Sequence, residues 1–195
     1  MVWGKAGSTT LSSAGDDLDI TSMTASKFNQ ILGHHINSGS KAVNINFNGN
    51  SNSVYARRKS FNGGTDSTST SQTTLNVNLN HSAPEFFISY VCDVTSEEKL
   101  MILFNTDTNT AGAGNAPTRQ EYVAKFVPSP SARITRVDTN NDQSGSYDTD
   151  SNITALGSDL TPAAAVPIKV QDGAVFHETD TNKAYVLYNN TWSEL

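Results

Sequence analysis

The side chains best suited to bind a ligand lie in the segment 55–61, where an aromatic residue precedes a basic cluster. Tyr55 stands two positions before the triplet Arg57-Arg58-Lys59. An aromatic ring can stack on a sugar or a nucleotide, and arginine side chains donate several hydrogen bonds. An exposed strand with cross-strand pairs gives the same pattern and is the favoured interpretation. The binding interpretation, kept as the alternative, makes Tyr55, Arg57 and Arg58 a candidate ligand surface.

The cysteine and the adjacent histidines offer little for catalysis or metal binding. Cys92 lies in the apolar run 86–92, and no nearby basic residue would lower the pKa of its thiol. We therefore predict that Cys92 is a small buried hydrophobic residue. His34 and His35 are neighbours, and neighbouring side chains on a strand point to opposite faces. That geometry makes a poor metal site.

Acidic residues raise two further hypotheses, a glycosidase and a calcium site. A glycosidase needs two carboxyl groups that flank the substrate. Glu85, Glu98 and Glu121 are the only candidates in predicted strands, and the strands of any sandwich carry a few such residues. Two acidic loops match the first three oxygen ligands of a helix-loop-helix calcium site: Asp138, Asn140 and Asp142, and Asp148, Asp150 and Asn152. Both lack the glycine at the sixth position and the glutamate at the twelfth. We predict a non-enzymatic protein without cofactor or metal, with calcium in these loops as the alternative.

Composition narrows the class of protein. Hydrophobic residues make up 36% of the 195 residues and charged residues only 16%, and the net charge is −6. Ser, Thr, Asn and Gly fill the difference, which suits turns and exposed sheet faces. Basic residues form no stripe longer than the triplet 57–59, so we predict no nucleic-acid partner. No apolar run reaches the length of a signal-peptide core or a membrane span, so we expect no membrane insertion.

Alternation of apolar and polar residues predicts the strands that position these side chains. In 43–48 Val43, Ile45 and Phe47 alternate with asparagines, which is typical of a strand with one buried and one exposed face. Asn48-Gly49 then predicts a tight turn. The same alternation recurs in 74–80. These two segments are the clearest half-buried strands of the chain.

Three further segments complete the predicted core. Residues 26–36 fit the spacing of an amphipathic helix. Gly33 and the turn residues 37–40 favour instead a strand that forms a hairpin with the next one. The segments 85–94 and 98–105 are the most apolar of the chain, which is typical of central strands covered on both faces.

Together these elements predict an all-β fold, a jelly-roll-like antiparallel β-sandwich of about eight strands over residues 1–158. Residues 159–167 form a Pro/Ala linker, and residues 168–195 form a small C-terminal β-hairpin module. The module is too small to bury its aromatic side chains by itself. We expect these side chains to pack on the main domain or to make subunit contacts with other copies of the chain: Phe176, Tyr185, Tyr188 and Trp192.

The chain contains Phe47-Asn48-Gly49-Asn50 with 51–55, then 131–137, a glycine-containing loop with Tyr147, and 153–157. This series of motifs over residues 9–158 resembles a β-sandwich domain found in virion proteins of tailed viruses, mostly tail-fibre or other structural proteins. The C-terminal residues are similar to a short module at the C-terminal end of phage structural proteins. That similarity is carried by Phe176, Glu178-Thr179-Asp180-Thr181, Lys183, Tyr185 and Trp192.

The resemblance implies a non-enzymatic structural protein on the virion surface, such as a capsid decoration, head-fibre or tail component. Its partners would be other copies of itself, as a trimer by analogy, and other virion proteins. It also implies host attachment, and it brings no catalytic residue to this sequence. The chain lacks the long coiled-coil or β-helical shaft of a tail fibre, which favours a smaller component. The alternative is a carbohydrate-binding β-sandwich that holds a host glycan through Tyr55, Arg57 or Trp3.

Overall fold

The computed structural model describes residues 3–36, 39, 41–81, 83–108, 110–129, 131–158, 173–178, 183–189 and 191–195, and for 78–81 the backbone alone. The chain divides into two units, Met1–Leu160 and Thr161–Leu195. The predicted linker 159–167 lies outside the described residues. Every helix or strand of the described residues is a β-strand, which confirms the all-β prediction.

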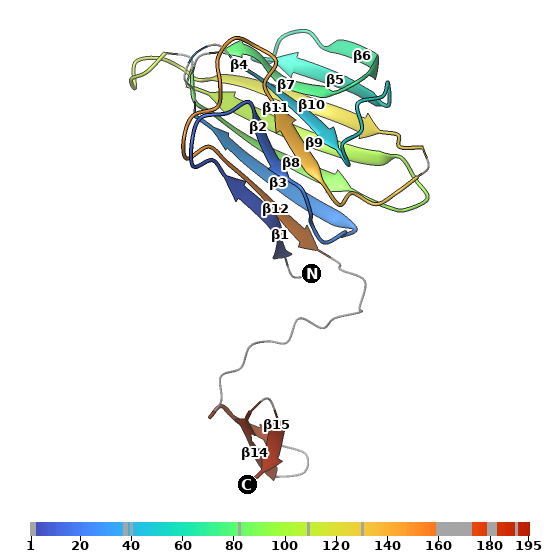
Figure 1. The fold of residues 1–195 in the computed structure, drawn as a ribbon, viewed down its shortest axis with the longest axis vertical. Coiled ribbons are helices and arrows are strands. Elements are labelled where there is room, and N and C mark those ends of the chain that lie inside the picture. Colours follow the sequence, from blue (N-terminus) through green and yellow to red (C-terminus); the bar gives the residue numbers. More distant parts are fainter. Residues whose placement is uncertain are drawn as a thin grey trace. The chain divides into compact units, whose positions relative to one another are not determined.

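The described part of the larger unit forms two antiparallel sheets that face each other (Figure 1). Their strands are β1 (Trp3–Thr10), β2 (Asp17–Ile20), β3 (Phe28–His35), β4 (Lys41–Phe47), β5 (Tyr55–Phe61), β6 (Ser67–Gln72), β7 (Leu75–His81), β8 (Glu85–Cys92), β9 (Lys99–Asp107), β10 (Thr118–Phe126), β11 (Val137–Asn140) and β12 (Asn152–Ser158). The eight-stranded sheet has the order β1-β12-β3-β8-β9-β10-β5-β6, and the four-stranded sheet has the order β2-β11-β4-β7.

Eight of these strands are connected as a jelly roll. Half of them form the order β1-β12-β3-β8, and the other half form the facing order β2-β11-β4-β7. The other strands are two insertions, β5 and β6 after β4, and β9 and β10 after β8. The insertions pair with each other through β10 and β5 and widen one sheet beyond β8. The predicted jelly-roll sandwich is therefore confirmed as the frame, and the insertions extend it.

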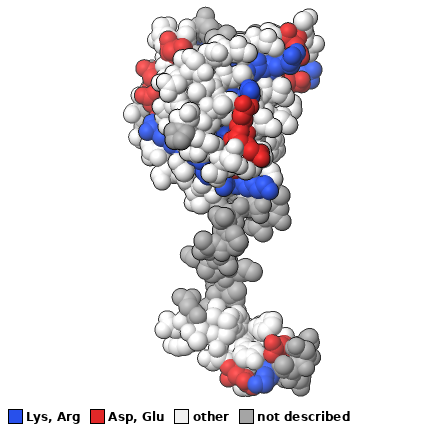
Figure 2. Space-filling view, turned by 90° about the vertical axis from the view of Figure 1, so that its right-hand side faces the viewer, with Lys and Arg blue, Asp and Glu red and all other residues white. Residues whose placement is uncertain are grey.

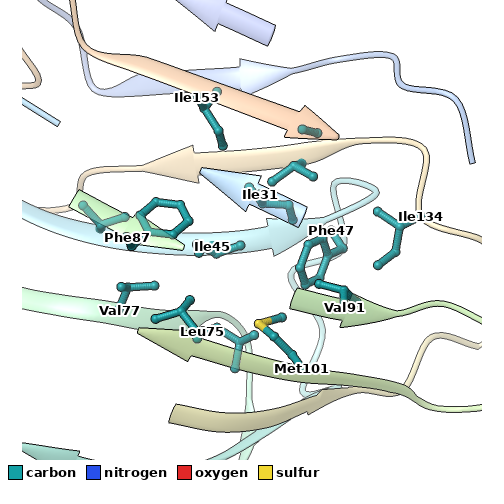
Figure 3. Close-up of a cluster of buried hydrophobic side chains, with 14 of the residues drawn as sticks. Ile31, Ile45, Phe47, Leu75, Val77, Phe87, Val91, Met101, Ile134 and Ile153 are labelled. Carbon is teal, nitrogen blue, oxygen red and sulfur yellow. The ribbon is translucent and has the colours of Figure 1, made fainter. Parts of the chain in front are cut away.

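The core fills the space between the two sheets. Ile45, Phe47, Leu75 and Val77 point inward from the four-stranded sheet, toward Ile31, Phe87, Val91, Met101 and Ile153 of the other sheet (Figure 3). The alternation that predicted β4 is confirmed, because its apolar residues are all buried. The predicted turn after β4 is also present, with positive φ angles at Asn48 and Gly49.

The segment that fitted both a helix and a strand is strand β3. It pairs with β12 on one side and β8 on the other, so its predicted hairpin partner β4 lies in the opposite sheet. Gly33 is required at its position, because a Cβ atom there would lie 2.1 Å from the Phe87 ring. Gly33, which favoured a strand over a helix, thus leaves room for the buried Phe87 ring.

The described residues of the smaller unit form a three-stranded antiparallel sheet rather than a single hairpin. Its strands are β13 (Val175–Glu178), β14 (Lys183–Tyr188) and β15 (Thr191–Glu194), in that order. The Phe176 ring lies 6.3 Å from that of Tyr185 and 6.2 Å from that of Trp192. Phe176, Tyr188 and Trp192 nevertheless stay exposed, and Tyr185 is half-buried.

Candidate interaction surface

The predicted ligand surface does not form as a unit, because its aromatic residue is in the core. Tyr55 is buried and stacks on Phe126 with ring centroids 5.0 Å apart. Its hydroxyl donates to the Asn50 carbonyl at 2.9 Å and accepts from the Phe47 amide at 2.9 Å. Burial raises the pKa of Tyr55. The prediction is therefore wrong for this residue, whose hydroxyl fixes the turn after β4 instead.

The two arginines of that prediction point away from each other. Arg57 is half-buried, with its guanidinium 5.9 Å from the centre of the Tyr122 ring, and it donates to the Asn76 carbonyl of β7. It thereby links the inserted strand β5 to the jelly-roll frame. Arg58 is exposed on the outer side and pairs with Asp66 at 3.4 Å. Only Arg58 of the three candidates is freely exposed.

The most distinctive surface of the molecule is the outer side of β8, β9 and β10. Inward and outward residues alternate in β8 and β9, yet the outward ones are apolar too. We call the following set the outer apolar face: Phe86, Tyr90, Leu100, Ile102, Phe104 and Val123. The apolar segments 85–94 and 98–105 had predicted central strands covered on both sides. The strands are central, but within the described residues only their inner side is covered.

Strand register makes the outer apolar face continuous. Ile102 of β9 lies between Tyr90 of β8 and Val123 of β10. Leu100 and Phe104 flank it along the same strand. A shallow hollow of about 550 Å³ is lined by Trp3, Tyr90, Leu100, Ile102 and Val123 among others. A second, of about 400 Å³, is lined by residues that include Phe86, Phe104 and Arg119.

Charged residues of both signs border the outer apolar face. Arg119 lies 3.5 Å from Glu121, Lys125 lies 2.8 Å from Glu98, and Arg58 lies 3.4 Å from Asp66. On the side of the molecule drawn in Figure 2, acidic and basic side chains also lie close to one another, and uncharged residues cover most of the surface. The border thus has no single sign of charge.

The outer side of the four-stranded sheet is chemically the opposite. We call its outward side chains the polar outer face: Asp19, Asn46, Asp138 and Asn140. Asp138 is paired in register with Asp19 on one side and Asn46 on the other. Arg136 contacts both carboxylates, at 3.3 Å from Asp19 and through a short hydrogen bond to Asp138. Burial and the Asp138 charge raise the pKa of Asp19 to about 6.

A buried charged group at one end of the sandwich could be mistaken for a catalytic site. Lys41 lies 3.1 Å from Glu85, and His35 Nδ1 lies 3.8 Å from the other carboxylate oxygen. These three side chains have no exposed surface. Burial, with the Lys41 charge, lowers the pKa of His35 to about 3, so His35 is neutral. A carboxylate that a substrate cannot reach compensates Lys41 rather than serving as a general acid.

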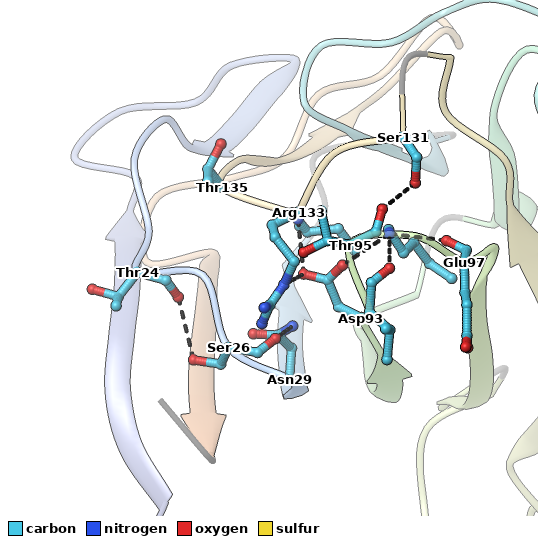
Figure 4. A network of polar contacts seen from close by, with 12 residues as sticks. Thr24, Ser26, Asn29, Asp93, Thr95, Glu97, Ser131, Arg133 and Thr135 are labelled. Carbon is cyan, nitrogen blue, oxygen red and sulfur yellow. Dashed lines mark hydrogen bonds and ion pairs between the residues drawn. The ribbon is translucent and has the colours of Figure 1, made fainter. Parts of the chain in front are cut away.

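A second buried charged group stabilises the opposite end. Asp93, directly after β8, contacts Lys99 at 3.4 Å and Arg133 at 3.1 Å, and it accepts from the Ile134 amide at 2.8 Å (Figure 4). Lys99 also donates to the Glu97 carbonyl at 2.9 Å. Asp93 therefore ties the β8–β9 connection to the segment before β11. Neither buried group was predicted, since lysine is rarely buried and its partners lie far along the chain.

The remaining candidate residues do not converge on a site. Among the described residues no group of three or more His, Cys, Asp or Glu side chains is placed to hold a metal ion. Asp138 and Asn140, predicted in a loop, belong to strand β11. His34 is exposed and His35 buried, which confirms that they point to opposite faces. Cys92 is half-buried and lines the larger hollow, so the prediction of a fully buried thiol is wrong.

Comparisons with protein-family models, with curated proteins and with solved structures find no match to this chain. In the described residues, no helix is long and apolar enough to cross a membrane.

Proposed function

We propose that this chain is a non-enzymatic structural protein of a virion surface, which acts by assembling with other subunits. The outer apolar face carries this proposal. Soluble monomers rarely expose a large contiguous apolar patch, and one bordered by polar residues marks an interaction site. Leu100 is 60% exposed, Val123 is 53% exposed and Ile102 is 50% exposed, in adjacent positions of one flat surface. Covering them by a partner would remove this area from water.

The virion location is supported by the fold and by the sequence resemblance. Jelly rolls include viral capsid domains and lectin domains, so the fold is compatible with the proposal without deciding it. The turn Asn48-Gly49 and the segment 131–137, which carry the resemblance, lie together: the Asn48 side chain donates to the Arg133 carbonyl at 2.9 Å. The motif thus serves to join two loops at one end of the sandwich.

The C-terminal sheet supplies a second region suited to assembly. Tyr188 is 73% exposed, and Phe176 and Trp192 are also exposed in a sheet whose described residues bury only Leu187 among the large hydrophobic ones. Subunit contacts through these aromatic residues, in a trimer by analogy, remain a prediction. Host attachment to a glycan also remains a prediction, with Arg58 and Trp3 as its exposed candidates.

Purified particles from the source of this sequence test the proposal. We expect mass spectrometry to find the chain in density-gradient-purified virions, in a fixed copy number relative to the major capsid protein. Hydroxyl-radical footprinting should modify Tyr90 and Phe104 less in the particle than in the isolated protein, and Tyr188 serves as an independent probe of the C-terminal sheet. Absence of the chain from particles, or hydrolysis of a surface polysaccharide by the pure protein, would contradict the proposal.

A further inference from the structure

We infer that the outer apolar face binds a second copy of this chain across a two-fold axis, with β9 of one subunit over β9 of its partner. The inference rests on the proposed function and names the partner of the same surface. It commits to a self-complementary contact rather than to docking on an unrelated particle protein. Shape, charge and strand register each favour a second copy.

The face carries both exposed apolar side chains and hollows. Leu100 and Phe104 project from β9, while hollows of about 550 Å³ and about 400 Å³ lie beside them on the same surface. In a two-fold contact the same patch meets itself, so projections and hollows must both be present on one face. An axis that lies in the interface and passes near Ile102 brings the projections of each copy over the hollows of the other. Two sheets pack face to face in this manner at about 10 Å.

The charges at the border fit a second copy better than a partner of one sign. Three basic residues at the border each have an acidic neighbour in the same chain: Arg119 with Glu121, Lys125 with Glu98, and Arg58 with Asp66. These pairs are locally neutral, so two identical borders can approach without net repulsion. A strongly charged partner would require a border of the opposite sign. An apolar centre with a polar rim is also the usual anatomy of subunit interfaces.

Strand register identifies the residue at the centre of the contact. Ile102 has apolar neighbours in all four directions, namely Tyr90, Val123, Leu100 and Phe104. A residue near a two-fold axis faces the same residue of its partner. A charge introduced at this position therefore meets a like charge in the dimer. Because Ile102 is 50% exposed in the single chain, the same substitution leaves the fold of each subunit intact.

The test uses the full chain and two variants, Ile102→Glu and Ile102→Lys. We expect light scattering to give each variant half the molar mass of the native protein, whatever association the C-terminal sheet adds. An equimolar mixture of the variants should recover the native mass, because a carboxylate then faces an ammonium group. Asn140→Lys and Asn140→Glu, on the polar outer face, are matched controls that should keep the native mass. Circular dichroism should show the same strand content for every variant.

Two results would overturn the inference. Equal masses for the native protein and Ile102→Glu would show that the face makes no contact between copies. A mixture that stays at the mass of the variants would show that position 102 does not face itself, and that the copies meet without a two-fold axis near Ile102. The proposed function is tested separately. A protein that is dimeric in solution but absent from purified particles would contradict the proposed function and support the two-fold contact. A protein that is monomeric but present in particles would support the proposed function and contradict the two-fold contact.

Discussion

The two outer faces of the sandwich show that one antiparallel architecture can carry a polar surface on one side and an apolar surface on the other. On the polar outer face, the outward residues of β4 and β11 include asparagine and aspartate. Asn46 donates to the Asn50 carbonyl, and Asp138 accepts from Arg136 and from the Gly49 amide. On the outer apolar face, the outward residues of β8 and β9 are aromatic and aliphatic. Antiparallel sheets commonly expose one polar face. Of the two faces, only the polar outer face therefore has the side chains expected of a sheet surface that stays in water.

This asymmetry follows the boundary between the jelly-roll frame and its insertions. The polar outer face belongs entirely to frame strands. The outer apolar face lies on the last frame strand of its half-sheet, β8, and on the inserted strands β9 and β10. The insertions thus contribute to the core, through Tyr55, Met101, Leu103, Tyr122 and Phe126, and also supply much of the apolar surface beside the frame. We infer that they are the part of the chain that adapts a common fold to assembly.

The largest expected effect is a difference in stability between substitutions on the two sides of strand β8. Phe87→Ala should destabilise the fold by about 3–5 kcal/mol, because it empties a buried site against Gly33 and His35. Phe86→Ala, one residue away on the outer apolar face, should cost about 1 kcal/mol or less. Both are measured by urea denaturation in the Ile102→Glu background, so that association does not contribute. Equal losses for the two variants would mean that the outer apolar face stabilises the single chain, contrary to our comparison.

A smaller effect is expected on the polar outer face, where Asp19 and Asp138 are neighbours. The pKa of Asp19 is raised from 3.8 to about 6, so the folded protein binds a proton that the unfolded chain has lost. Stability of the native protein should therefore decrease as the pH rises from about 4 to about 6. Asp19→Asn should remove this decrease and add about 1 kcal/mol at neutral pH, the full shift being reduced by solvent screening.

The measurement is the unfolding free energy of Asp19→Asn across this pH range. Glu97→Gln is the control, since it removes one carboxylate from an exposed position away from the polar outer face. A native-like pH dependence in Asp19→Asn would show that Arg136 fully compensates both carboxylates. The charges of Asp19 and Asp138 on the polar outer face would then cost no stability.

The sequence predicts the jelly-roll strands better than it predicts the outer apolar face. Where apolar and polar residues alternate, as in 43–48, the pattern predicts which residues point inward. The apolar residues of β4 are buried as predicted, although Asn44 is buried as well. In 98–105 both alternating sets are apolar, so the pattern cannot state that Leu100, Ile102 and Phe104 point outward. Which of the two sets points inward depends on the strands of the four-stranded sheet that cover β9. Those strands lie far from β9 along the chain, so the residues of 98–105 alone do not determine it.

Long-range partners also explain the residues whose roles were missed or misassigned. Tyr55 was placed on a ligand surface because basic residues follow it, but its ring is buried by Phe126, about seventy residues away along the chain. Lys41 and Glu85 compensate each other across the two sheets. Spacing within one segment carries no information on either pairing. The apolar character of the outward positions in β8 and β9 was the one signal of the outer apolar face, and it was attributed to burial on both sides.

The smallest expected effect concerns salt. The centre of the outer apolar face is uncharged, and the ion pairs at its border form within each copy, so screening removes little attraction between copies. Raising sodium chloride from about 50 to about 500 mM should change the dimer dissociation constant by less than about threefold in sedimentation equilibrium. Ammonium sulfate, which strengthens apolar burial, should tighten the dimer. A contact that used the polar outer face, with Asp19 and Asp138 near Arg136, would respond strongly to sodium chloride and would assign assembly to the opposite side.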